Sequence, residues 1–162
     1  MNSKEIYDLC IEKAIESPCQ KRGFGAVLMM GGNVVALTNN HHLEVAGHIC
    51  DPTCIRFKID SGSDSMIGAC GHAEEHAVWQ ATKIYGDLSS KMAMLYVAGV
   101  SKPDNVPLVK TEPFFYCIRC ATLMNYAGIF GVNVWVDERW HFLNSKEAYQ
   151  SSLDFALKLR KA

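Results

Sequence analysis

Two near-continuous apolar runs in the second half of the chain constrain its fold more than any other feature. They span residues 92–100 (MAMLYVAGV) and 132–136 (VNVWV). A strand with one face in water alternates apolar and polar residues, whereas a strand covered on both faces is apolar almost throughout. We therefore expect two buried strands in a sheet that carries helices on both faces.

Four other segments have the apolar spacing of three to four residues that is typical of amphipathic helices. Ser3 is a suitable N-cap for the first of them and Pro18 ends it, while Gly128 closes the third. The expected helices span residues 3–17, 72–85, 117–127 and 145–160.

Residues 24–30 (FGAVLMM) and 34–38 (VVALT) are short apolar runs on either side of Gly31 and Gly32. Because glycine adopts the positive φ of a tight hairpin turn, we expect two antiparallel strands here. Helices and strands then alternate along the chain. This order indicates an α/β fold, a three-layer α-β-α sandwich around a mixed sheet of four or five strands.

The length of 162 residues fits a single domain over residues 1–162. Within it, residues 39–71 hold Gly, Ser, His and Cys without a sustained period, which predicts a cysteine-bearing insertion. No apolar run approaches the roughly 20 residues that span a membrane, and the first residues lack the layout of a signal peptide. We therefore expect a cytoplasmic protein without membrane contact.

The formal net charge of −1 lacks the basic excess that polynucleotide binders use to neutralise phosphates, so a small substrate is expected. The seven cysteines are a high number for such a chain. Because cytosolic thiols stay reduced, spaced cysteines there indicate metal ligands or a catalytic thiol before they indicate disulfides.

Two separated segments together have the composition of a catalytic zinc site. Catalytic zinc takes three protein ligands and leaves one position to water, and His72, Cys117 and Cys120 supply that number. Each segment is predicted to begin a helix, where unpaired N–H groups stabilise a thiolate. Glu74 stands two residues after the histidine, where its carboxylate can accept a proton from water and deliver it to a leaving amine.

His72-Ala73-Glu74 followed by Cys117-Ile118-Arg119-Cys120 resembles the signature of the zinc-dependent cytidine/deoxycytidylate deaminase superfamily. The order of elements along most of the chain is also similar. The resemblance implies a cytidine deaminase-like fold, a homo-oligomer and hydrolytic deamination of a nucleobase with release of ammonia. The insertion resembles the deoxycytidylate branch, so the cytosine of a free (deoxy)cytidine nucleotide is the expected substrate. Adenine, guanine or an RNA base is the alternative.

The same resemblance implies roles for single residues. His72, Cys117 and Cys120 would hold Zn²⁺, and Glu74 would move protons. Asn40 would contact the sugar or base, and the backbone N–H of Ala73 would contact the pyrimidine carbonyl.

The sequence departs from the family pattern at two places. The family usually has proline directly before the first cysteine, whereas here Phe114, Phe115 and Tyr116 separate Pro113 from Cys117. The second departure is at the end of the chain, where no fifth strand follows the last expected helix. The family's zinc ligands can still be assigned to this sequence despite these departures. The shape of the family's substrate pocket, and hence its substrate, cannot be carried over in the same way.

Two other classes of protein compete with a deaminase. His72-Ala73-Glu74-Glu75-His76 also fits His-x-x-Glu-His, a metallopeptidase motif in which His76 is a ligand and Glu75 the base. That interpretation leaves Cys117 and Cys120 unexplained, and we favour His76 as a helix residue below the site. A metal-stapled binding module without catalysis is the other alternative.

A second, structural zinc site would order residues 39–71, and the resemblance to some deoxycytidylate deaminases supports it. Its candidate ligands are Cys19, Cys50, Cys54 and Cys70, with His48 as a substitute. The alternative is that these are separate buried thiols, as we expect for Cys10.

Further substrate contacts are expected from two segments. Phe114, Phe115 and Tyr116 are candidates to stack on a base, although aromatic clusters more often belong to a core. Arg22, preceded by Lys21, is a candidate for a nucleotide phosphate, although a solvated charge pair is more common.

Overall fold

The computed structural model describes residues 1–42, 54 and 70–159. Its helices are α1 (Ser3–Glu16), α2 (Ala73–Tyr85), α3 (Ile118–Tyr126) and α4 (Ser145–Leu159). All four lie within two residues of the expected spans. The first N-cap is Asn2 and not Ser3, because the Asn2 side chain accepts from the Glu5 N–H and the Glu5 carboxylate accepts from the Asn2 N–H.

The main sheet is mixed and has the strand order β2-β1-β5-β7-β8, and the short β6 pairs with β5. Only β5 and β7 are parallel, and the other pairs are antiparallel. The strands are β1 (Arg22–Met30), β2 (Asn33–Asn39), β5 (Met94–Ser101), β6 (Val106–Pro107), β7 (Gly131–Val136) and β8 (Arg139–Asn144). The two short strands β3 (His41–His42) and β4 (Cys70–Gly71) pair separately.

The expected α/β fold and the first hairpin are confirmed, with Gly31 and Gly32 at φ of +56° and +82° in the turn. No strand follows α4 within the described residues, as expected, but the main path of the sheet still contains a fifth strand. The fifth strand, β8, lies before the last helix and pairs with β7 through a two-residue turn at Asp137 and Glu138.

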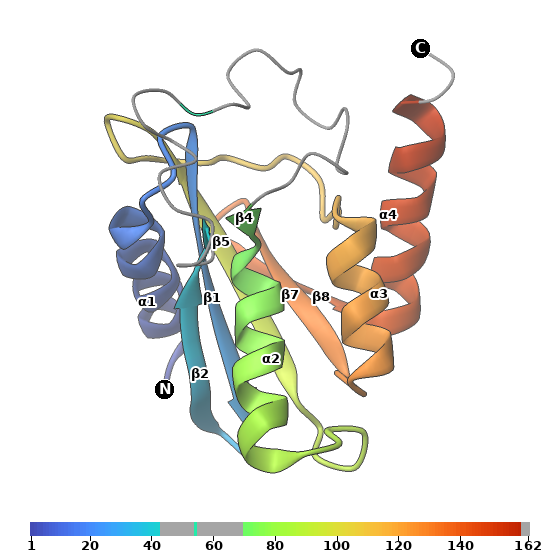
Figure 1. Cartoon of the computed structure of the whole chain (residues 1–162). Coiled ribbons are helices and arrows are strands. Elements are labelled where there is room, and N and C mark those ends of the chain that lie inside the picture. The colour runs from blue at the N-terminus through green and yellow to red at the C-terminus, as the bar shows by residue number, and fades with distance from the viewer. Residues whose placement is uncertain (43–53, 55–69, 160–162) are drawn as a thin grey trace.

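Helices cover the sheet on both faces, as Figure 1 shows. Alternate residues of β1 belong to two separate apolar clusters, Ala26 and Leu28 to one, Val27 and Met29 to the other. The second cluster includes Ile6 and Cys10 of α1, while the first includes residues of α2 and α3. Cys10 is fully buried, as expected.

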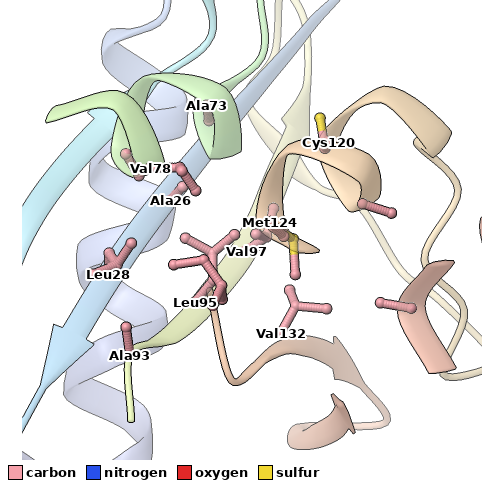
Figure 2. Packing of buried hydrophobic residues seen from close by; sticks show 14 of the residues in the cluster. Ala26, Leu28, Ala73, Val78, Ala93, Leu95, Val97, Cys120, Met124 and Val132 are labelled. Atoms are coloured by element: carbon pink, nitrogen blue, oxygen red, sulfur yellow. The ribbon is translucent and has the colours of Figure 1, made fainter. Parts of the chain in front are cut away.

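Helix α2 packs closely on β1 and β2 because its buried face is built mainly from small residues. Ala73, Ala77 and Ala81 are all fully buried. Figure 2 shows Ala73 and Val78 above Ala26 and Leu28, with Met124 of α3 beside Leu95 and Val132. This packing fixes the first turn of α2 and the first turn of α3 relative to one sheet.

Within the described residues, no helix is both long enough and apolar enough to cross a membrane.

Candidate metal centre

Helices α2 and α3 begin at the same end of the sheet (Figure 1), and the residue that caps each of them carries a metal-binding atom. His72 is the N-cap of α2, and Cys117 is the N-cap of α3. The Cys117 sulfur accepts from the backbone N–H of Cys120 at 3.3 Å. The cap therefore brings the two cysteines of one turn to the same point.

The three expected zinc ligands converge. Nδ1 of His72 lies 3.2 Å from the sulfur of Cys117 and 3.2 Å from that of Cys120. All three ligand atoms lie within 4.8 Å of one another. Within residues 1–42, 54 and 70–159, this is the one group of three or more His, Cys, Asp or Glu side chains so arranged.

The charges of the site favour the ligand form of one cysteine. A hydrogen bond from Cys120, together with His72, lowers the pKa of Cys117 to about 4, against the opposing effect of burial. Burial alone would lower the pKa of His72, but the hydrogen bond to Cys117 and the charge of Glu74 outweigh it and raise the pKa. Burial raises the pKa of the Cys120 thiol. These opposite pKa shifts favour a thiolate at Cys117 and a protonated Cys120, whose proton a metal ion would displace.

Glu74 lies in the first turn of α2 with only 8% of its surface exposed. Burial raises the pKa of its carboxyl group, and the nearby His72 and Lys110 oppose that rise. A buried carboxylate beside a metal site suits general acid–base chemistry, because burial brings its pKa closer to neutral pH.

Lys110 is a residue of the site that sequence reasoning missed. Its Nζ donates to the Phe114 carbonyl at 3.3 Å and lies 5.1 Å from the centre of the Tyr116 ring. Burial lowers the pKa of Lys110, and attraction to Glu74 opposes that shift. The segment before α3 therefore turns a cation toward the carboxylate of α2.

Asn40 uses its side chain to extend the contact between β1 and β2. Its Oδ1 accepts from the Phe24 N–H at 2.6 Å and its Nδ2 donates to the Arg22 carbonyl at 3.0 Å. Among the residues that the structure describes, the Asn40 amide nitrogen donates to the Arg22 carbonyl, which leaves its second N–H as a donor there. Arg22, the candidate for a contact with a nucleotide phosphate, is an exposed residue at the start of β1.

The expected aromatic trio points in different directions. Phe115 is buried in the main core, and its backbone exchanges hydrogen bonds with the Ser151 hydroxyl of α4. Phe114 and Tyr116 pack on each other and on Phe155 of α4, with centroid distances of 4.9–6.0 Å. These contacts fix the segment before Cys117 to α4, and a stacking contact between this trio and a base stays a prediction.

His76 is stacked on the ring of His41, with centroids 3.8 Å apart, and is not part of the three-ligand cluster. Its ring fills the space above Gly71, where a Cβ would lie 2.3 Å from Nε2. This arrangement agrees with a helix residue below the site and not with the His-x-x-Glu-His interpretation.

The proposed second zinc site is only partly described, because Cys50 and His48 lie outside the described residues. Cys54 is buried, and its N–H donates to the side chain of Gln20, next to Cys19. Cys19, Cys54 and Cys70 do not form a three-ligand group by themselves.

One imidazole and two thiols on two helix N-termini suit Zn²⁺, which binds nitrogen and sulfur ligands and is held by three protein groups in catalytic sites. The class of protein that this fold and site define is a zinc-dependent hydrolase. The family model for the cytidine and deoxycytidylate deaminase zinc-binding region matches residues 1–136. The chain therefore belongs to the cytidine and deoxycytidylate deaminase family, and it is a zinc-dependent hydrolytic deaminase.

Several solved structures are similar to this chain at low sequence identity. A cytidine deaminase from Burkholderia pseudomallei superposes with a TM-score of 0.58 at 14% identity, covering 91% of this chain and 96% of that one. A deoxycytidylate (dCMP) deaminase from the cyanophage S-TIM5, in complex with dCMP and dUMP, gives 0.47 at 16% identity, with 98% and 95% covered. A structure from a study of tRNA:A34 deaminases gives 0.44 at 19% identity, with 82% and 75% covered. No curated protein matches the sequence.

Proposed function

We propose that this deaminase acts on the cytosine of a free nucleoside or nucleotide. Among these compounds we expect a deoxycytidylate-like nucleotide to be the preferred substrate. The observation that carries the proposal is the buried carboxylate of Glu74 beside the cluster of His72, Cys117 and Cys120. Bound zinc would supply an activated water as the nucleophile. The family's reaction then needs a group that moves protons between that water and the leaving amine.

Glu74 is the group that moves those protons. Its raised pKa lets it hold a proton that it has accepted, and its place on a helix start keeps it near the leaving group. The helix is anchored at this turn, because the Thr38 hydroxyl donates to the Ala73 carbonyl at 2.7 Å. The carboxylate thus keeps a fixed position through both proton transfers.

Substrate orientation is assigned to Ala73 and Asn40. The N–H of Ala73 belongs to the first turn of α2, where helical N–H groups have no partner within the helix. We propose that it donates to the pyrimidine carbonyl, and that the remaining N–H of Asn40 donates to the sugar or the base.

The near-neutral charge of the chain supports a small substrate over RNA. We further propose a homo-oligomer in the cytoplasm, as the resemblance to the family implies. A second zinc ion, held by Cys19, Cys50, Cys54 and Cys70, remains part of the proposal.

The test is ammonia release from a panel of free bases, nucleosides and nucleotides of cytosine, adenine and guanine. We expect turnover of cytosine compounds, and we expect turnover about 10²–10⁴-fold slower in the matched variant Glu74→Gln at the same zinc content. Turnover of the adenine or guanine compounds alone would contradict the assignment of cytosine. Equal rates of ammonia release in the variant and the wild type would contradict the role of Glu74. A mobility shift with RNA that is lost only at high salt would favour an RNA base.

A further inference from the structure

An ion pair joins the two helices that carry the metal ligands. Nη2 of Arg119 donates to Oε2 of Glu75 at 2.7 Å, and Nε lies 2.5 Å from Oε1 as an ion-pair contact without hydrogen-bond geometry. The arginine lies between Cys117 and Cys120 in α3, and the glutamate lies three residues after His72 in α2. This two-point contact, one hydrogen bond and one ion-pair contact, restrains the distance between the two helix starts.

Both members of the pair also hold the backbone around His72. The Glu75 carboxylate accepts from the His72 N–H at 2.8 Å, and Arg119 Nη2 donates to the Cys70 carbonyl at 3.3 Å. The turn that carries the histidine is therefore tied to α3 at two points, one on each side of Gly71.

The setting of the pair differs from that of an ordinary surface ion pair. The side chains of Glu75 and Arg119 are 19% and 40% exposed, whereas those of the Lys4–Asp8 pair on α1 are 58% and 67% exposed for Asp8 and Lys4. Exposed pairs add little to stability because water screens them and the side chains must be ordered. The Arg119 guanidinium is also attracted by both metal-binding sulfurs.

We propose that Glu75 and Arg119 are positioning residues that set the spacing between His72 and the two cysteines and thereby raise the affinity of the site for zinc. Partners outside the ligand shell orient ligands, and their loss typically lowers metal affinity about 10–100-fold. The proposal concerns metal binding, so it does not depend on which base is deaminated.

The test compares Arg119→Met, Arg119→Lys and Glu75→Gln with the wild type and with Lys13→Met, which removes an ion pair on α1. Zinc affinity of the purified full chain is measured by competition with a chromophoric chelator, and the visible spectrum of the Co²⁺-loaded chain reports the geometry of the ligands. We expect about 10–100-fold weaker zinc binding and an altered Co²⁺ spectrum for Arg119→Met and Glu75→Gln.

Arg119→Lys keeps the charge but not the two-point contact, so its affinity should fall between Arg119→Met and wild type. It also provides a milder variant if Arg119→Met does not fold. In the double variant Glu75→Gln/Arg119→Met, the loss of affinity should be smaller than the product of the two single losses, because each removes the same contact.

Zinc affinities of the variants within twofold of the wild type, with thermal unfolding of the metal-free chain at lower temperature, would assign the pair a merely structural role and overturn the proposal. A loss of zinc affinity in the double variant equal to the product of the two single losses would overturn the proposal as well. Failure of the proposed function would be seen separately, as a zinc-loaded wild type that releases no ammonia from the substrate panel.

Discussion

The first turns of α2 and α3 face the same point but are built differently. Helix α2 has two acidic residues in its first turn, Glu74 and Glu75, and the latter completes a capping box with His72. Helix α3 has no acidic residue in its first turn, and its cap is the sulfur of Cys117. Negative charge at a helix N-terminus is favourable, so each start is stabilised, the first by carboxylates and the second by a thiolate.

The difference separates two tasks. The α2 turn is stabilised by its own helix, which leaves Glu74 available for proton transfer. The α3 turn depends on the groups that bind the metal. Loss of a cysteine of the α3 turn should therefore remove the ion, whereas replacement of Glu74 in α2 should spare the ion and affect the reaction.

The largest expected effect comes from Cys120→Ser in α3. This change replaces a soft thiolate with a hydroxyl that binds zinc poorly, so zinc content should fall by one ion per chain and activity should be lost. Metal analysis of the purified protein measures this. His76→Ala in α2 is the control and should retain the ion. The opposite pattern would favour the His-x-x-Glu-His interpretation.

Glu74→Gln should have the next largest effect. The amide cannot carry the proton, so we expect kcat to fall about 10²–10⁴-fold at unchanged zinc content. Steady-state kinetics with the preferred substrate measure the loss. If zinc were lost together with activity, the two helix starts would not have separate tasks.

Cys54→Ser tests the proposed second zinc site. If a second zinc ion is held there, the wild type contains two zinc ions per chain and the variant contains one, with a lower temperature of unfolding. After the variant is reloaded with zinc at low temperature, the site of His72, Cys117 and Cys120 should remain active. A wild-type content of one zinc per chain would remove the structural site.

The smallest expected effect is a pH dependence at His76, one turn below His72. Burial and the neighbouring His41 lower the pKa of His76 in the folded chain, so the unfolded chain binds more protons in acid. Its stabilising contribution is complete above about pH 6.5 and is lost as the pH falls through the lowered value.

In His76→Gln, the free energy of unfolding should therefore decline less steeply below about pH 6.5 than in the wild type. Urea unfolding between pH 5 and 7.5 measures both slopes, and His141→Gln on β8 controls for the loss of an imidazole elsewhere. We expect a difference below about 1 kcal/mol, since His76 is partly exposed and solvent screens it. If the free energy of unfolding changed equally with pH in the variant and the wild type, His76 would make no contribution to the pH dependence of stability.

The sequence predicted the helices, the first hairpin and the three converging ligands, because these depend on local spacing and on the chemistry of zinc. It did not predict β8, since the turn before this strand uses Asp137 and Glu138 at φ of +47° and +59°. Such turns normally contain Gly or Asn, so the hairpin had no turn signal.

Local sequence patterns also could not predict the contacts between distant segments. Glu75 and Arg119 are 44 positions apart, and only the packing of α2 beside α3 brings them together. The aromatic trio was expected near the pocket because it adjoins Cys117. Phe115 turns instead into the core, and its neighbours pack on α4.

The contact between Phe155 and the aromatic residues before Cys117 has an evolutionary consequence. Helix α4 carries none of the metal ligands, so its sequence can drift without loss of the ion. Each exchange at Phe155 or Ser151 nevertheless shifts the segment that bears Lys110. New substrate ranges can therefore arise through mutations remote from the reacting atoms, while the chemistry itself is preserved.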